Sequence, residues 1–133
     1  MVRKIIYLMK PRAEAIIDDP QKMNKFLDTV TKNFLSKFKK YPHIAGSGVD
    51  FLWLLSMLGA YAKKEYTDVS RKTLIIAVGG LFFIIYPYEL YPERPKTLEY
   101  LMNIKILKVI LDESKVDIDR YRAWKESQEG DEK

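Results

Sequence analysis

Residues 73–106 read TLIIAVGGLFFIIYPYELYPERPKTLEYLMNIKI, and this stretch decides the fold of the 133-residue chain. Its first part, residues 73–88, carries no charge. Its middle contains Pro87, Pro92 and Pro95, and because each proline lacks a backbone N–H donor, a helix cannot continue through them. A second apolar segment begins after the prolines. The stretch therefore predicts a helical hairpin with a buried first arm and a turn rich in proline and tyrosine.

The charge-free arm is predicted to be a buried helix rather than a membrane span. Ser70 is a favoured N-cap residue, and Pro87 ends the helix. A helix over residues 73–88 rises about 24 Å, which is short of the roughly 30 Å hydrocarbon core of a bilayer. Gly79 and Gly80 each cost about 1 kcal/mol relative to Ala inside a helix. The pair therefore indicates the close approach of a neighbouring helix, or a bend.

The proline-rich turn carries a family resemblance. Residues 86–96 read YPYELYPERPK and lead into TLEYLMN. Pro87, Leu90, Pro92 and Leu101 match, without gaps, a pattern that reads Ser-Pro-x-Asp-Leu-Ile-Pro-Asp-x-Ile-Pro and then Gly-x-Leu-Asp-Asp. This pattern is the signature of the YkvA-like family, a bacterial domain of unknown function, which the chain resembles. The resemblance extends loosely to the C-terminal DRYRAWKES and implies an all-α fold.

The chain departs from the family pattern mainly at its acidic positions. Glu89 and Glu93 stand where the pattern has aspartates, whereas Met102 and Asn103 replace its Asp-Asp pair. Tyr86 replaces the serine. Half of the acidic cluster is therefore missing, and the resemblance implies a fold for this chain but not a chemistry.

Composition excludes several classes of site. The chain has no cysteine and a single histidine, so it has no disulfide, no thiol nucleophile and no cysteine- or histidine-rich metal site. We expect one all-α domain over residues 1–126, followed by a disordered acidic tail over residues 127–133. The apolar run Ile5–Met9 is too short for the core of a signal peptide, and we expect a cytoplasmic protein.

The net charge of +5 is concentrated in the first half of the chain, where residues 1–72 carry 14 Lys or Arg against 7 Asp or Glu. Asp19 and Pro20 predict the start of a helix that reaches about Lys40. Its apolar residues share one face. The opposite face is predicted to contact an anionic surface through its lysines: Lys22, Lys25, Lys32, Lys39 and Lys40. The alternative is an ordinary core-facing helix with a solvated lysine face.

The remaining segments complete an expected compact bundle of about four main helices. The chain begins with an arm that holds a helical turn or two at residues 12–18. A helix from residue 47 or 48 to about 65 contains the charge-free run 51–62, which is apolar on every side and indicates contact with a second copy, hence a homo-oligomer. A helix is expected to begin near Thr97, a plausible N-cap residue. It is expected to continue as one long helix into the C-terminal region, because polar residues follow a strict three–four alternation: Lys105, Lys108, Asp112, Lys115, Asp119, Arg122 and Glu126.

The sequence shows no catalytic constellation, no metal ligand set and no cofactor motif. We therefore expect a small helical interaction protein that self-associates or lies peripherally on the inner face of a membrane. Tyrosine supplies a large contact area with little loss of side-chain entropy, which favours the turn as the contact surface. The candidate binding residues are Tyr86, Tyr88, Glu89, Tyr91, Glu93 and Asn103.

Two alternatives stay open. Glu89, Glu93 and Asn103 offer oxygen atoms that suit a divalent cation or acid–base work in an enzyme. The lysine-rich face also suits non-specific nucleic-acid binding, although the chain contains no nucleic-acid reading motif and this is the less favoured alternative. The sequence identifies no small-molecule substrate.

Overall fold

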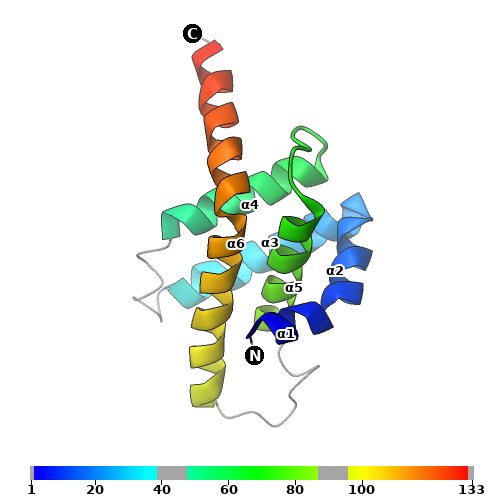
Figure 1. The fold of residues 1–133 in the computed structure, drawn as a ribbon, viewed down its shortest axis with the longest axis vertical. Coiled ribbons are helices and arrows are strands. Elements are labelled where there is room, and N and C mark those ends of the chain that lie inside the picture. The colour runs from blue at the N-terminus through cyan, green and yellow to red at the C-terminus, as the bar shows by residue number, and fades with distance from the viewer. Residues whose placement is uncertain (1, 39–47, 87–95, 132–133) are drawn as a thin grey trace.

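The computed structural model describes residues 2–38, 48–86 and 96–131, and these residues form six packed α-helices without a β-strand (Figure 1). The all-α prediction is confirmed. Four of the helices correspond to predicted ones, and two more precede them. The helices are α1 (Val2–Leu8), α2 (Lys10–Ile17), α3 (Pro20–Phe38), α4 (Gly48–Ala62), α5 (Arg71–Ile85) and α6 (Lys96–Asp131).

Helix α5 is the centre of the fold, because other helices cover it on most sides. It packs against α1, α2, α3 and α6 (Figure 1). The Ser70 side chain accepts a hydrogen bond from the Thr73 backbone N–H at 3.2 Å, so the predicted N-cap is confirmed. The last helical residue is Ile85. The predicted turn falls on residues 87–95, outside the described residues, and the hairpin as a whole stays a prediction.

Gly79 and Gly80 bring α5 close to two different helices. A Cβ atom on Gly79 would lie 3.2 Å from the carbonyl oxygen of Ile6 in α1. A Cβ atom on Gly80 would lie 2.6 Å from Cδ1 of Ile110 in α6 and 3.1 Å from Cγ2 of Ile106. A side chain at Gly80 would force a shift of Ile110, and one at Gly79 would be tight, which confirms the expected close approach of neighbouring helices.

The N-terminal arm is more ordered than the sequence predicts. Helices α1 and α2 occupy residues 2–17, where we expected only a turn or two at residues 12–18. Pro11 has no N–H to continue the hydrogen-bond ladder, which accounts for the break between them. One buried residue recurs every four positions through both helices: Ile5, Met9, Ala13 and Ile17. Burial of this stripe against α5 stabilises the helices, although each is short for an isolated helix in water.

Helix α4 ends earlier than predicted, in a left-handed turn. Lys64 has φ 62°, and its backbone N–H donates to the carbonyl oxygen of Tyr61 at 3.0 Å. The N–H of Glu65 reaches back to the carbonyl oxygen of Ala60 at 2.9 Å. These two bonds form a Schellman motif, in which the left-handed position is usually occupied by glycine.

Helix α6 is a single helix of 36 residues, so the long helix predicted from the polar stripe is confirmed. The helix continues through residues 127–131, so the prediction of a disordered tail is wrong for these residues. Residues 132 and 133 lie outside the described residues. Residues 125–129 are mainly good helix formers. An ion pair between Arg122 and Glu126, with Nε and Oε1 3.1 Å apart, also stabilises the preceding turn of the helix. The C-terminal end of α6 projects beyond the other helices (Figure 1).

Aromatic residues fix the second half of α6 to the rest of the molecule. Tyr121 is 2% exposed, and its hydroxyl lies 2.7 Å from the hydroxyl of Ser56 in α4. The ring of Trp124 packs against those of Tyr66 and Tyr121, with centroids 4.9 Å and 5.8 Å away. The helix is therefore held by side-chain packing up to residue 124.

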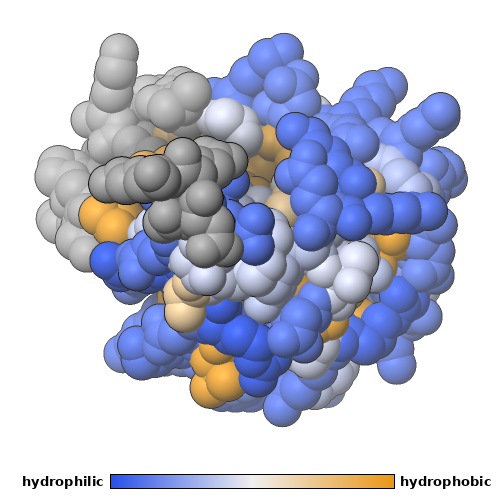
Figure 2. All heavy atoms as spheres, turned by 90° about the horizontal axis from the view of Figure 1, so that it is seen from above, coloured by the Kyte–Doolittle hydropathy of each residue, from blue (hydrophilic) through white to orange (hydrophobic). Residues whose placement is uncertain are grey.

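The face of the molecule at the C-terminal end of α6 is largely hydrophilic (Figure 2). Viewed from the end at which α6 terminates, hydrophobic residues form small, separated groups (Figure 2). None of the helices over residues 2–38, 48–86 and 96–131 has the length and apolar content of a membrane span.

Candidate functional site

A shallow groove of about 280 Å³ lies between α2, α3 and α5. Its lining combines two lysines with two phenylalanines and a tyrosine. We call it the basic aromatic groove, and it is lined by Ile16, Lys22, Lys25, Phe26, Thr29, Phe82 and Tyr86.

Three aromatic rings form the floor of the basic aromatic groove. The rings of Phe26 and Phe82 stack with their centroids 6.3 Å apart and an interplanar angle of 21°. The rings of Phe82 and Tyr86 lie closer, with centroids 4.8 Å apart. Tyr86 is 42% exposed at the C-terminal end of α5. The rings therefore form a continuous apolar path from the core to the surface.

Positive charge surrounds this aromatic floor. The guanidinium carbon of Arg12 lies 5.6 Å from the centroid of Phe82, within the range of a cation–π contact. Lys22 and Lys25 are exposed, and neither forms an ion pair with a carboxylate among the residues that the structure describes. Lys32, further along α3, pairs with Asp28 at 3.0 Å. The two lysines that line the groove are therefore available to an anionic partner.

Local chain geometry explains why these side chains meet. The Asp19 carboxylate accepts hydrogen bonds from the backbone N–H groups of Gln21 at 3.0 Å and Lys22 at 3.3 Å, which confirms the predicted start of α3. Lys22 and Phe26 are four residues apart on α3, as are Phe82 and Tyr86 on α5, so each pair shares one helix face. The groove forms where these two faces meet.

The structure brings together only some of the predicted site residues. Tyr86 lies in the basic aromatic groove with Lys22 and Lys25, although the sequence placed the tyrosine and the lysines on separate surfaces. Lys32 is exposed on α3 and does not line the groove. Tyr88, Glu89, Tyr91, Glu93, Lys39 and Lys40 lie outside the described residues.

Asn103 is not at a surface. It is 4% exposed within α6, and its Oδ1 atom has no hydrogen-bond partner. A buried amide oxygen without a hydrogen-bond partner is uncommon. Asn103 nevertheless does not line the basic aromatic groove. Among the described residues, no group of three His, Asp or Glu side chains is close enough to hold a metal ion. The cation-site alternative depends on Glu89 and Glu93, outside that part of the chain, and it stays a prediction.

Sequence reasoning missed Ile16 and Phe82 as groove residues, and it missed the contact of Arg12 with the Phe82 ring. Arg12 and Ile16 are four residues apart, as members of one helix face should be, but the segment was expected to be mostly an arm. Phe82 belongs to a charge-free run in which no position stands out as exposed. The packing of α2 against α5, a contact between segments about 70 residues apart, is what brings these residues together.

Comparison with protein-family models, curated proteins and solved structures finds no match to this chain. The likeness to the YkvA-like family therefore depends only on the residues of the proline-rich turn and the helical layout.

Proposed function

We propose that this protein is a helical interaction protein that binds an anionic membrane surface peripherally through the basic aromatic groove. The observation that supports this function is the presence of Lys22 and Lys25 beside the partly buried ring of Phe82 and the exposed ring of Tyr86. Lysines near an anionic bilayer are attracted by its surface potential, and aromatic rings suit the boundary between headgroups and acyl chains. The cytoplasmic leaflet supplies such a surface.

The contact is expected to be shallow and sensitive to salt. The groove residues belong to helices whose other faces are buried, so insertion beyond the side chains would disrupt the core. Attraction between exposed charges is screened over about 8 Å at physiological ionic strength. Bound protein should therefore be released by high salt without detergent.

Replacing both groove lysines should weaken vesicle binding. Each lysine near an anionic surface contributes about 1 kcal/mol, so Lys22→Ala with Lys25→Ala should bind about 30-fold more weakly. Flotation of the purified protein with vesicles of phosphatidylcholine and phosphatidylglycerol mixed two to one measures the bound fraction. Vesicles of phosphatidylcholine alone should bind neither protein.

A matched control separates the groove from overall charge. Lys105→Ala with Lys108→Ala removes the same charge from exposed positions of α6, outside the groove. That variant should bind nearly as well as the wild-type chain. Equal losses in the two double variants, or equal binding to neutral vesicles, would contradict a role for the groove. Binding to duplex DNA in preference to the vesicles would favour the nucleic-acid alternative.

Self-association is a second candidate function, and exposed apolar residues on α4 favour it. Val49 is 63% exposed and Leu52 is 61% exposed, one turn apart. Much of the charge-free run 51–62 that led us to expect a homo-oligomer is folded inward, because these of its residues are buried in one chain: Phe51, Leu54, Met57, Leu58, Ala60 and Ala62. What remains on α4 is a small patch, which suits a weak contact between two copies.

Leu52→Glu should shift any self-association towards the monomer, since it places a charge in this α4 patch. Light scattering over a range of micromolar concentrations would give the mean mass of each protein. Val116→Glu is the control, because Val116 is 69% exposed on α6, outside the patch. A wild-type chain that is monomeric at every concentration, or an equal effect of both variants, would exclude this patch as the interface.

A further inference from the structure

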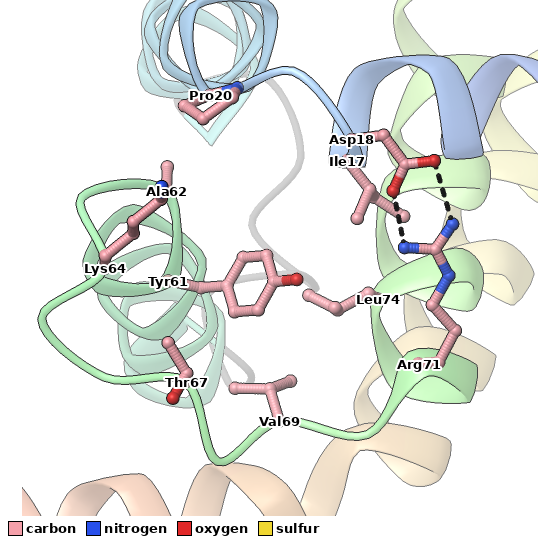
Figure 3. A pocket seen from close by; sticks show the side chains of 10 residues that line it. All are labelled: Ile17, Asp18, Pro20, Tyr61, Ala62, Lys64, Thr67, Val69, Arg71 and Leu74. Carbon is pink, nitrogen blue, oxygen red and sulfur yellow. Dashed lines mark hydrogen bonds and ion pairs between the residues drawn. The ribbon is translucent and has the colours of Figure 1, made fainter.

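A second and larger cleft, of about 530 Å³, lies where the ends of α2 and α4 meet the start of α5 (Figure 3). It shares no lining residue with the basic aromatic groove. Its volume falls within the range of about 300–1,000 Å³ that is typical of small-molecule sites. It is lined by Ile17, Asp18, Pro20, Tyr61, Ala62, Lys64, Thr67, Val69, Arg71 and Leu74.

One side of this cleft is apolar. The ring of Tyr61 points from α4 across the cleft towards Leu74, with Val69 below it and Ile17 on the opposite wall (Figure 3). The Tyr61 side chain is only partly buried. Together these side chains offer an apolar surface to the hydrocarbon body of a small ligand.

The acidic group of the cleft is already neutralised. Arg71 donates to both carboxylate oxygens of Asp18, from Nη1 at 2.8 Å and from Nη2 at 3.2 Å, and its Nη2 also lies 3.5 Å from Glu14 (Figure 3). The hydrogen bond from Arg71 holds the pKa of Asp18 below its ordinary value. The pair therefore forms a fixed polar wall without free charge, and a ligand cation finds no unpaired carboxylate among the lining residues.

Two cations, Lys64 and Arg71, line the cleft. Arg71 pairs with Asp18, whereas Lys64 forms no ion pair with a carboxylate among the residues that the structure describes. Lys64 occupies the left-handed position of the Schellman motif at φ 62°, where an ordinary side chain is less favourable than glycine. A glycine would fit the turn better but would leave the cleft without this ammonium group. The backbone conformation is thus compatible with selection for a charge at this position.

We propose that this cleft binds a small carboxylate with an apolar body. The body would pack against Ile17, Val69 and Leu74, and the carboxylate would pair with the ammonium group of Lys64. The bidentate Asp18–Arg71 pair holds α2 to α5 and keeps the wall in place. This ligand class follows from the cleft alone and is independent of membrane binding.

Three probes with the same eight-carbon body test the charge preference. Octanoate, octan-1-ol and octylamine are titrated into ¹⁵N-labelled full-length protein, and the backbone amide shifts of residues 61–74 are followed. Octanoate should produce saturable shifts there, octan-1-ol should bind more weakly, and octylamine should bind least. No saturable shift with octanoate in the millimolar range, or a stronger response to octylamine, would overturn the proposal.

Two variants at Lys64 separate binding from stability. Lys64→Ala and Lys64→Gly should each weaken octanoate binding about fivefold, the effect of losing about 1 kcal/mol from an exposed ion pair. Lys64→Gly should at the same time raise the Tm, because glycine suits the left-handed turn. Lys63→Ala, which removes the neighbouring charge outside the lining, should change neither the binding of octanoate nor its site of binding. Unchanged affinity in both Lys64 variants, or an equal loss in Lys63→Ala, would exclude Lys64 as the anion partner.

The same titration distinguishes this proposal from the proposed function. Lys22→Ala with Lys25→Ala should leave octanoate binding unchanged, since neither residue lines the cleft. Lys64→Ala should leave vesicle binding near the wild-type level. Loss of octanoate binding in the groove variant would place the carboxylate site in the groove instead and overturn its assignment to the cleft.

Discussion

Gly80→Ala is expected to lower the free energy of unfolding by about 2 kcal/mol, because it places a methyl group inside a packed helix contact. The new Cβ would lie 2.6 Å from Cδ1 and 2.9 Å from Cγ1 of Ile110, a fully buried residue that has little space to move. The gain in helix propensity, about 1 kcal/mol, offsets only part of the strain. Chemical denaturation followed by circular dichroism measures the change.

Another glycine in the chain provides the control for Gly80→Ala. A Cβ atom on Gly59, within α4, would meet nothing within 4 Å, so Gly59→Ala should leave stability unchanged or raise it. Ile110→Val removes the atom nearest to the clash, and Gly80→Ala combined with Ile110→Val should be less destabilised than the sum of the two single changes. A stabilising Gly80→Ala would mean that α5 and α6 are less closely packed than described.

Asp117→Asn is also expected to destabilise the protein by about 2 kcal/mol. Asp117 is only 6% exposed, and its carboxylate accepts hydrogen bonds from the backbone N–H of Ser70 at 3.2 Å and from the Ser70 hydroxyl at 2.9 Å. It thereby ties α6 to the N-terminal end of α5, where a negative charge is also favoured by the helix dipole. Hydrogen bonds to a charged acceptor contribute about 1.5–3 kcal/mol. Thermal unfolding of both proteins at neutral pH measures the loss.

The pH dependence of this loss is a second measurement on the same variant. Burial by itself raises the pKa of Asp117, but hydrogen bonds from Thr73 and Ser70 and the charge of Arg120 outweigh it, so the pKa is lowered. A lowered pKa in the folded state gives stability that is present above the ordinary Asp pKa of about 4 and is lost as the pH falls through the folded value. The Tm difference between wild type and Asp117→Asn should therefore shrink in acid.

Asp119→Asn is the control for Asp117→Asn. Asp119 is two residues along the same helix, mostly exposed, and pairs with Lys115 at 3.4 Å, so its loss should change stability very little. Residual acid sensitivity is expected in every variant, because Arg3 also lowers the pKa of Glu113 and Arg71 lowers that of Asp18. A Tm difference that does not depend on pH would exclude Asp117 as a charged link between α5 and α6.

Features that depend on local sequence could be predicted well. Ser70 and Asp19 cap their helices as expected, since an N-cap needs only the residue and the backbone two or three positions later. The polar stripe of α6 also follows from periodicity within one helix. The length of α6 was underestimated because an acidic sequence suggested disorder, whereas its residue types also favour a helix.

Features that depend on distant contacts could not be predicted. The first helix is short, and it and the start of α2 gain stability from the surface of α5 around Gly79, which lies beside Ile6 and Met9. The groove joins Ile16, Lys25 and Phe82, which no sequence spacing connects. Both the missed helix and the missed part of the site therefore depend on the same event, the packing of the N-terminal segment on α5.

The central position of α5 also constrains how the chain can fold during synthesis. Its Gly80 face is covered by Ile106 and Ile110 of α6, which leave the ribosome well after α5 itself. Until then the nascent chain carries a helix without charge from residue 73 onward, which α1, α2 and α3 can cover only in part. We expect the emerging polypeptide to need protection by a chaperone during this interval, and truncation before residue 106 to yield aggregates rather than a smaller folded protein.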